Sequence, residues 1–404
     1  MTSAETALAT GLVARTRPIE APVDLLAALG ADGVAWVHDG AGFVTAGIAD
    51  RVAPAAVAGV LGAIATDDTV RRPGTGPIAV GALPFRHLAA ATLVVPARVT
   101  GVATDGTAWV TEIGPEARDG AVRTASTGIE HRAPSPGVDR AAWTAAVTRV
   151  LRAISEGDLE KVVLAREITV DAAHAFEPRS VLARLRETGG RYLYADCTRP
   201  GGAVVGASPE LLVRRTGRVA VSQPLAGTIR RDPARAGDDP GAELLASDKD
   251  SREHRITVAA VAQVLAAEGG TVEAREGPDL ATLPTMVHLE STVTAHFAAG
   301  APSALDLALS LHPTPAVGGT PRAAALAAIA AIEDFDRGCY AGPVGWVDVH
   351  GDGEWAVALR GAELHGRRAR VIAGAGIVAG SDPDAEWDEV DAKLEPTLDL
   401  LMSG

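Results

Sequence analysis

The sequence is poor in aromatic residues, in cysteine and in long apolar runs, and the last two shortages each exclude a class of protein. Cys197 and Cys339 are the only cysteines in 404 residues, so the chain has neither a disulfide framework nor a CxxC metal pair. No apolar stretch reaches the roughly 18 residues of a membrane span. The first residues also lack the basic-then-apolar order of a signal peptide. We therefore expect a soluble, cytoplasmic protein.

Clusters of basic residues are missing as well. The chain carries 37 Lys and Arg against 51 Asp and Glu, a formal net charge of −14. A strongly acidic protein without a basic patch repels nucleic acids and anionic membranes, so we expect neither as a partner. A small anionic substrate remains compatible with this charge if a divalent cation or a few Arg and Lys side chains reverse the local field.

The residues that are abundant describe a large aliphatic core. Hydrophobic residues make up 47% of the chain and aromatic residues only 3%, so Ala, Val and Leu must fill the interior. Short β-branched runs dominate the first 115 or so residues and predict sheet, while the polar stretch 116–138 predicts a loop or boundary. Helices then alternate with many strands. This pattern favours an α+β fold with large mixed or antiparallel sheets and peripheral helices over a doubly wound fold.

Acidic residues recur at helical spacing in two predicted helices, 241–268 and 384–402. Asp250 and Glu253 are three residues apart, and Glu386, Glu389 and Lys393 fall at i, i+3 and i+7, so each set shares one helix face. Two such faces could converge on Mg²⁺, which prefers one or two carboxylates, waters and substrate oxygens. Solvated helix faces carry the same pattern, so the spacing alone leaves both interpretations open.

Two charged residues stand beside apolar strands. Lys161 opens KVVLAR, where it either snorkels to solvent or points into a closed pocket. In a pocket, desolvation would lower the pKa of its amine and suit a general base. Glu210, in GASPELLV, is the matching case, because burial would raise the pKa of its carboxyl toward that of a general acid.

Three polar positions are candidates for binding an anion or a substrate oxygen. In PLAGT, Gly227 and Thr228 offer a backbone N–H and a hydroxyl to a carboxylate, although an ordinary tight turn would use the same residues. His288, in MVHLEST, is either a structural histidine or a donor to a substrate oxygen.

An arginine inside an apolar run predicts a second anion site. Arg360 is predicted mid-strand, in a strand over 355–363, where it needs an anionic partner. Tyr340 and a predicted AGAG loop at 373–376 would complete this site. None of the glycine-rich stretches has the spacing of a nucleotide-phosphate loop.

Taken together, the motifs resemble one enzyme family. They occur in order from about residue 140 to the end, and they are KVVLAR, GASPELL, PLAGT, SDKDSREH, HLEST, LHPTPAVGG, FDRGCYAGPVGW, GDGEW, LR and AGAGIV…SDP…EW…K. They resemble the chorismate-utilising enzymes, most closely the isochorismate synthases. The resemblance implies two large mixed or antiparallel sheets packed against each other, in a single two-lobed domain over 1–404. Its N-terminal part, 1–120, would be more variable and sheet-rich, and 139–404 would be the catalytic core.

The resemblance also implies a reaction and its acid–base pair. Lys161 would activate water to attack C2 of chorismate, and Glu210 would protonate the departing C4 hydroxyl. The substrate-binding positions would be Gly227, Thr228, His288, Ala316, Val317, Tyr340, Arg360, Gly374 and Lys393.

The resemblance further implies a magnesium cofactor. Its ligands would be Glu253 and Glu389, supported by Asp250 and Glu386. Because chorismate is a dianion, an acidic protein can bind it only where Mg²⁺, Arg and Lys reverse the local charge.

Related activities within this family are the alternatives. Salicylate synthases share the lysine but differ where LHPTPAVGG lies here, at 311–319, and Ala316 and Val317 line the position that separates hydroxylating from lyase members. Anthranilate synthases carry a non-basic residue in place of Lys161 and typically PIAGT instead of PLAGT. Aminodeoxychorismate synthases usually work with a glutaminase, a partner that we do not expect here. A non-catalytic chorismate- or Mg²⁺-binding protein is the alternative from another class. We expect a monomer whose product serves siderophore or menaquinone synthesis.

Overall fold

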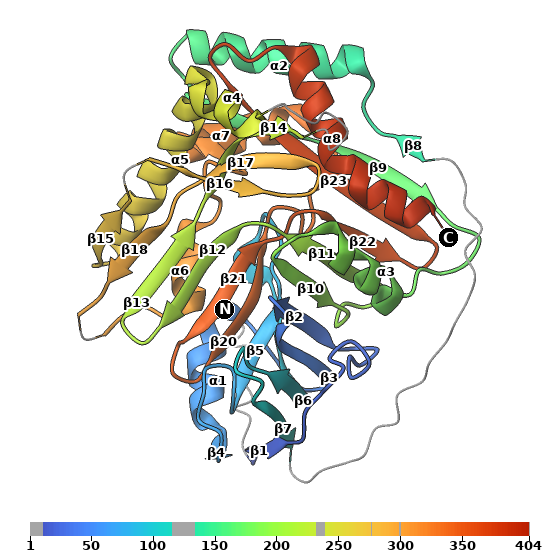
Figure 1. Cartoon of the computed structure of the whole chain (residues 1–404), viewed down its shortest axis with the longest axis vertical. Helices are drawn as coiled ribbons and strands as arrows, with labels where there is room; N and C mark the ends of the chain where they lie inside the picture. Colours follow the sequence, from blue (N-terminus) through green and yellow to red (C-terminus); the bar gives the residue numbers. More distant parts are fainter. Residues whose placement is uncertain (1–10, 115–133, 232–238, 276, 299, 404) are drawn as a thin grey trace, which may run out of the picture.

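A computed structural model describes residues 11–114, 134–231, 239–275, 277–298 and 300–403 (Figure 1). These residues form the α+β fold that the sequence predicts. Hydrogen bonds join 20 strands into one large sheet, in which all pairings except β1 with β4 are antiparallel, and β14, β16 and β17 form a separate three-stranded sheet. The predicted boundary at 116–138 and the first ten residues fall largely or wholly outside the described residues.

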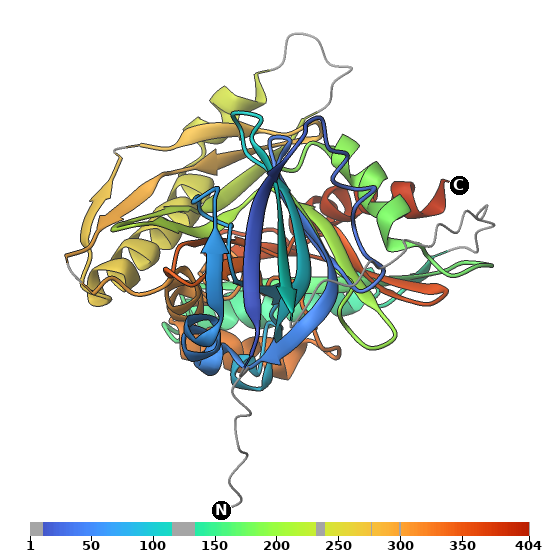
Figure 2. The ribbon, with the colours of Figure 1, turned by 90° about the horizontal axis from the view of Figure 1, so that it is seen from below.

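The N-terminal strands are hydrogen-bonded to those of the rest of the chain. β2 pairs with β10 and β5 pairs with β20, both antiparallel. Figure 2 views these N-terminal strands from below. They are β1 (Val13–Ile19), β2 (Val34–His38), β3 (Ala41–Val52), β4 (Ala65–Asp68), β5 (Ile78–Ala82), β6 (Leu93–Val102) and β7 (Ala108–Gly114).

The remaining strands follow residue 134. They are β8 (Ser135–Pro136), β9 (Lys161–Asp171), β10 (Tyr192–Asp196), β11 (Ala203–Ser208), β12 (Leu211–Thr216), β13 (Val219–Gln223), β14 (Leu225–Arg230), β15 (Thr271–Ala274), β16 (Asp279–Thr282), β17 (Met286–Glu290), β18 (Val293–His296), β19 (Gly319–Thr320), β20 (Pro343–Asp348), β21 (Gly353–Val357), β22 (Gly361–His365) and β23 (Arg368–Val378).

The helices lie around the strands, with α2, α4 and α8 along the upper part of Figure 1. They are α1 (Val57–Ala63), α2 (Arg140–Ser155), α3 (Pro178–Leu185), α4 (Pro240–Ala246), α5 (Asp248–Ala267), α6 (Ala304–Leu311), α7 (Arg322–Ile332) and α8 (Pro383–Met402). The single helix predicted over 241–268 is in fact two helices. Ser247 ends α4 and caps α5, because its hydroxyl accepts a hydrogen bond from the Asp250 N–H.

Two long strands and two helices position the site. β9 and β23 pair antiparallel along their whole lengths, with Lys161 opposite Val378 and Val163 opposite Gly376. α8 packs on β23, and α5 packs on β14 of the small sheet. α8 begins at Pro383, and its N-cap Asp382 accepts hydrogen bonds from two backbone N–H groups of the first turn.

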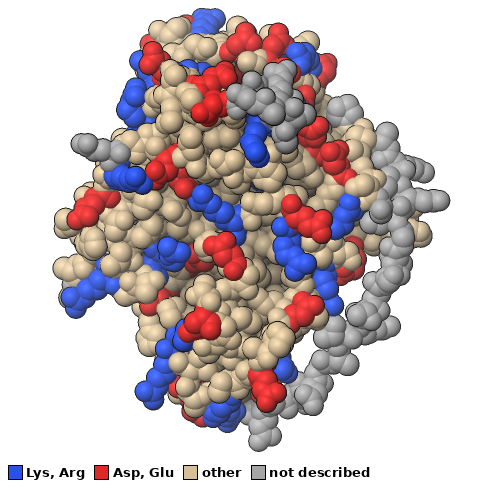
Figure 3. Space-filling view, viewed as in Figure 1, with Lys and Arg blue, Asp and Glu red and all other residues tan. Residues whose placement is uncertain are grey.

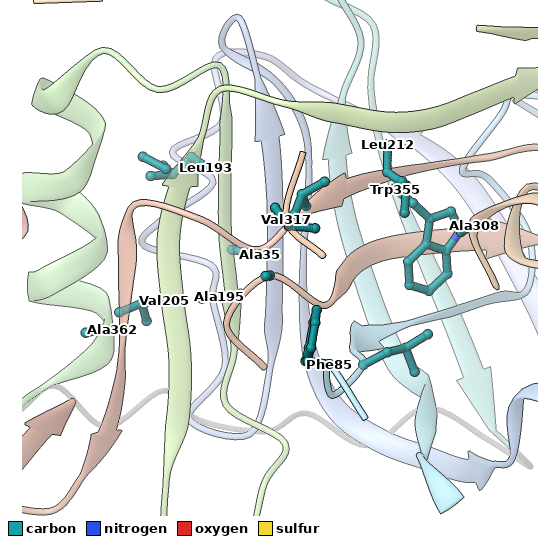
Figure 4. Close-up of a cluster of buried hydrophobic side chains, with 14 of the residues drawn as sticks. Ala35, Phe85, Leu193, Ala195, Val205, Leu212, Ala308, Val317, Trp355 and Ala362 are labelled. Carbon is teal, nitrogen blue, oxygen red and sulfur yellow. The ribbon is translucent and has the colours of Figure 1, made fainter. Parts of the chain in front are cut away.

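The core is continuous from the N-terminal strands to the C-terminal ones. Figure 4 shows Phe85, Leu212, Ala308 and the fully buried Trp355 in one apolar cluster, with Val317 beside them. Burying a Val, Leu or Phe side chain in such a cluster contributes about 1.5–3 kcal/mol to the free energy of folding. Because Val317 also lines the pocket described below, this core supports one wall of that pocket.

Charges of both signs are interspersed over the face of the molecule seen in Figure 3. This mixture agrees with the absence of a basic cluster in the sequence. Among the described residues, no helix has the length and apolar character needed to cross a membrane.

Candidate active site

One pocket gathers most of the residues that the sequence singled out. β14, β17, β23, α5 and α8 all contribute to its walls. The predicted residues in its lining are Glu210, Gly227, Thr228, Glu253, His288, Ala316, Val317, Tyr340, Arg360, Gly374 and Lys393. The other predicted residues do not line it. Lys161 and Glu389 are ion-paired with the lining residues Glu253 and Lys393, whereas Asp250 and Glu386 bond Ser247 and Lys249 outside the lining.

Lys161 is completely buried at the start of β9, so it does not snorkel. Its Nζ lies 2.9 Å from Glu253 Oε1, on α5, and 3.5 Å from Thr257 Oγ1. Although burial alone would raise the pKa of the Glu253 carboxyl, the charge of Lys161 and its hydrogen bond lower it. The pair thus places the Lys161 side chain directly behind a carboxylate of the pocket wall.

A glycine makes room for this pair. Gly376 lies on β23 opposite Val163, and a β-carbon at this position would sit 2.2 Å from Glu253 Oε1 and 2.9 Å from Lys161 Cε. Any larger side chain would force the carboxylate and the lysine apart. The AGAG stretch is therefore part of a strand, and the loop predicted at 373–376 was wrong.

Glu210 provides an acid at the same pocket. It follows Pro209, between β11 and β12, and is 3% exposed. Burial raises the pKa of its carboxyl to about 8, against the opposing charge of Lys161 and a backbone hydrogen bond from Leu225. At neutral pH this carboxyl holds its proton and can donate it.

The small sheet supplies a neutral histidine. Thr228 Oγ1 lies 2.9 Å from Nδ1 of His288, across the β14–β17 pair. Burial and then the charge of Arg360 lower the pKa of His288 well below its ordinary value. Gly227 has a φ of 78° at a bulge of β14, so it is not in a tight turn. His288 therefore acts in the pocket as an uncharged ring.

Arg360 differs from its prediction. β21 ends at Val357 and β22 begins at Gly361, so Arg360 lies between two strands instead of within one, with a left-handed φ of 51°. The sequence predicted one strand over 355–363 because both strands are apolar and no residue type at position 360 indicates a left-handed backbone. Its guanidinium contacts Met286 Sδ at 3.1 Å and His288 Nε2 at 3.4 Å.

Within the described part of the chain, no carboxylate forms an ion pair with Arg360. Burial lowers the pKa of its guanidinium to about 10, so the group is still charged at neutral pH. A charged guanidinium in a pocket wall without a carboxylate partner is a site for an anionic ligand.

Tyr340 and Gly374 lie together on the pocket wall. A β-carbon on Gly374 would come within 3.2 Å of the Tyr340 hydroxyl and 2.7 Å of the Leu164 carbonyl oxygen. Burial raises the pKa of Tyr340 to about 12, which leaves its O–H as a neutral donor. Lys393 Nζ donates to the Gly374 carbonyl at 3.0 Å.

The predicted metal ligands are held by lysines. Lys393 Nζ lies 2.6 Å from Glu389 Oε1, and Lys249 Nζ lies 2.6 Å from Glu386 Oε1. Lys249 was not among the predicted site residues. The Asp250 carboxylate bonds the Ser247 hydroxyl at 2.5 Å. Among the residues described, no three His, Cys, Asp or Glu side chains stand close enough to hold one metal ion.

These carboxylates still fit a magnesium ion. Mg²⁺ needs only one or two carboxylates when waters and substrate oxygens complete its octahedron, so a three-residue cluster is not required. Glu386 is 1% exposed, and its Oε2 has no hydrogen-bond partner among the described residues. A buried carboxylate oxygen that accepts no hydrogen bond is the kind of oxygen that a hard cation such as Mg²⁺ binds.

Several lining residues were not predicted. Leu359 and Ile372 are apolar and carry no signal in a single sequence. Thr397 also lines the pocket, and it lies four residues after Lys393 on the same face of α8. That spacing was the available signal for Thr397.

Comparisons with known proteins show the family of this chain. Residues 112–402 match the family model described as chorismate binding enzyme. The isochorismate synthase DhbC of Bacillus subtilis (strain 168) is 39% identical over 331 residues, which cover 80% of this chain and 80% of that protein. The isochorismate synthase EntC of Escherichia coli (strain K12) is 35% identical over 330 residues, covering 80% and 81%.

Solved structures show the same architecture. MenF, the menaquinone-specific isochorismate synthase from Escherichia coli, superposes with a TM-score of 0.81 at 25% identity, over 97% of this chain and 95% of that one. DhbC from Bacillus anthracis superposes with a TM-score of 0.80 at 32% identity, over 93% and 98%. With a family model that matches most of its length and relatives that cover four-fifths of it, this chain belongs to the chorismate-binding enzymes.

Proposed function

We propose that the protein is an isochorismate synthase, an isomerase that converts chorismate into isochorismate. The observation that carries the proposal is a pocket with an anion site that has a protonated carboxyl, Glu210, in its wall and a buried amine, Lys161, directly behind its lining residue Glu253. The relatives named above, which are isochorismate synthases, support the same reaction. They also make the salicylate-forming alternative the less favoured one.

The reaction moves a hydroxyl across the ring and needs a base and an acid. In its free-amine form, Lys161 accepts a proton from water as the water oxygen bonds to C2. The ring double bond shifts, the C4–oxygen bond breaks, and Glu210 gives its proton to the departing hydroxyl, which leaves as water. Each proton transfer contributes about 10²–10⁴-fold to the rate. One water enters and one leaves, so the product is an isomer of the substrate.

The pocket holds the substrate through cations and neutral donors. Arg360 takes one carboxylate of chorismate, and Tyr340 donates its hydroxyl nearby. Lys393 compensates negative charge on the α8 side of the pocket. His288, neutral and hydrogen-bonded to Thr228 through Nδ1, lines the substrate side of the pocket without adding a charge.

Mg²⁺ is the cofactor that we propose. Glu253 and Glu389 would hold it, with Asp250 and Glu386 in support. When bound, the ion would neutralise the ring carboxylate and withdraw electrons from the ring. Lys161, Lys249 and Lys393 form ion pairs with three of these acids, Glu253, Glu386 and Glu389.

Product analysis tests the proposal. The purified protein is incubated with chorismate and Mg²⁺, with and without ammonium and with EDTA as a control, and the products are separated by chromatography. We expect a mixture of chorismate and isochorismate that stops changing, reached from either compound, and no isochorismate in EDTA. Salicylate with pyruvate, or an amino product that depends on ammonium, would overturn the proposal.

A further inference from the structure

One hydroxyl in the pocket has no role in the mechanism above. Thr397 is 2% exposed and lines the pocket from α8. Its hydroxyl makes no hydrogen bond to any residue that the structure describes. A polar group that is so buried and faces a cavity without a partner is a binding group for whatever fills the cavity.

The other helical threonines show that this is unusual. Thr144 and Thr148 on α2 and Thr257 on α5 each donate to the carbonyl oxygen four residues earlier, at 2.8, 2.7 and 3.1 Å. This back-bond is the ordinary arrangement for a threonine inside a helix. Thr397 is the exception among the threonines in the described helices.

The turn of α8 around Thr397 explains the exception. The carbonyl that would accept its back-bond belongs to Lys393, and Arg360 Nη1 donates to this carbonyl at 3.5 Å. Pro396, inside the helix, has no N–H and leaves the Ala392 carbonyl without its helical donor. The guanidinium therefore reaches the carbonyl that would accept the Thr397 back-bond, on the turn of α8 that carries Thr397.

Resting on the proposed function, we infer that Thr397 is a substrate-binding residue that donates its O–H to the same carboxylate of chorismate that Arg360 holds. Lys393 and Thr397 are four residues apart on one helix face, which places Thr397 about 6 Å farther along the axis from the Glu389 end. One face of α8 thus meets both ends of a dianion, with Lys393 toward the metal ligands and Thr397 toward Arg360.

Two substitutions test the inference. Thr397→Val keeps the branched shape and removes the hydroxyl, and Thr397→Ser keeps the hydroxyl and removes a methyl group. We expect Thr397→Val to raise KM and the calorimetric Kd for chorismate roughly ten- to hundredfold, the usual loss for a hydrogen bond to a charged group, with little change in kcat. Thr397→Ser should stay close to the wild type. Thr148→Val, on an exposed face of α2, controls for replacing a helical threonine by valine.

The outcomes separate this inference from the function on which it rests. An unchanged Kd in Thr397→Val, or an equal loss in Thr397→Ser, would refute the inference and make Thr397 a packing residue. Thr397→Val combined with Arg360→Met should lose much less than the product of the two single effects, and full multiplication would show that the groups hold different parts of the ligand. A wild-type protein that neither binds nor converts chorismate would refute the proposed function itself.

Discussion

Replacing Glu210 by Gln should abolish turnover and stabilise the protein at the same time. The folded-state pKa of this carboxyl is about 8 because of its burial, against an ordinary value of 4.5. Gln keeps the shape of the protonated acid and cannot ionise, which removes the pH-dependent loss of stability. It also cannot give a proton to the departing hydroxyl, which removes the acid of the reaction. We expect kcat to fall about 10²–10⁴-fold.

The stability effect follows from the pKa difference. The unfolded chain loses this proton near pH 4.5 and the folded chain near pH 8. The folded state binds more protons between these values, so the contribution of Glu210 to stability is complete below pH 4.5 and is lost as the pH rises to about 8. At 1.36 kcal/mol per pKa unit, the loss is about 3 kcal/mol at pH 7 and about 5 kcal/mol above pH 8.

Chemical denaturation between pH 4.5 and 9 measures this effect. The advantage of Glu210→Gln over the wild type should be near zero at pH 4.5 and grow toward the values above, and wild-type turnover should fall as the pH passes 8. Glu187→Gln, at an exposed site, is the control and should show no such trend. A difference between Glu210→Gln and the wild type that does not change with pH would refute the assignment of Glu210 as the protonated acid.

Three further substitutions probe the other parts of the site. Lys161→Met should lower kcat about 10²–10⁴-fold while calorimetry still detects chorismate binding. Full activity of this variant would exclude Lys161 from the mechanism. Arg360→Met should raise the Kd for chorismate roughly hundredfold, and an unaltered Kd would show that the anion binds elsewhere. Gly376→Ala should lower the unfolding temperature and the activity because its β-carbon would meet Glu253 at 2.2 Å; a fully stable and active variant would mean that the carboxylate can move aside without loss.

Much of this architecture could be predicted from the sequence because its signals are local. The helix over 384–402 shows its acidic face and its Pro start, and KVVLAR and the N-terminal runs show β-branched strands. Ser247 was also readable as a cap, yet the continuous polar pattern concealed the break between α4 and α5. The cytoplasmic location and the monomeric state remain predictions.

The rest of the site depends on contacts that no local pattern contains. Whether Lys161 is buried depends on Glu253, which reaches it from α5, 92 positions later in the chain. Arg360 has a left-handed backbone, and a sequence predicts this conformation only where the residue is glycine or asparagine. Lys249 lies within the SDKDSREH motif, but only the fold brings this residue of α5 to Glu386 of α8.

The measurement that tests the central claim most directly is conversion of chorismate by the purified protein in H₂¹⁸O with Mg²⁺, followed by mass spectrometry of the products at early times. Water attack at C2 predicts isochorismate that is heavier by one ¹⁸O, while the unreacted chorismate stays unlabelled. Isochorismate without the label would contradict the proposed roles of Lys161 and Glu210, and a reaction that yields no isochorismate would contradict the proposed function.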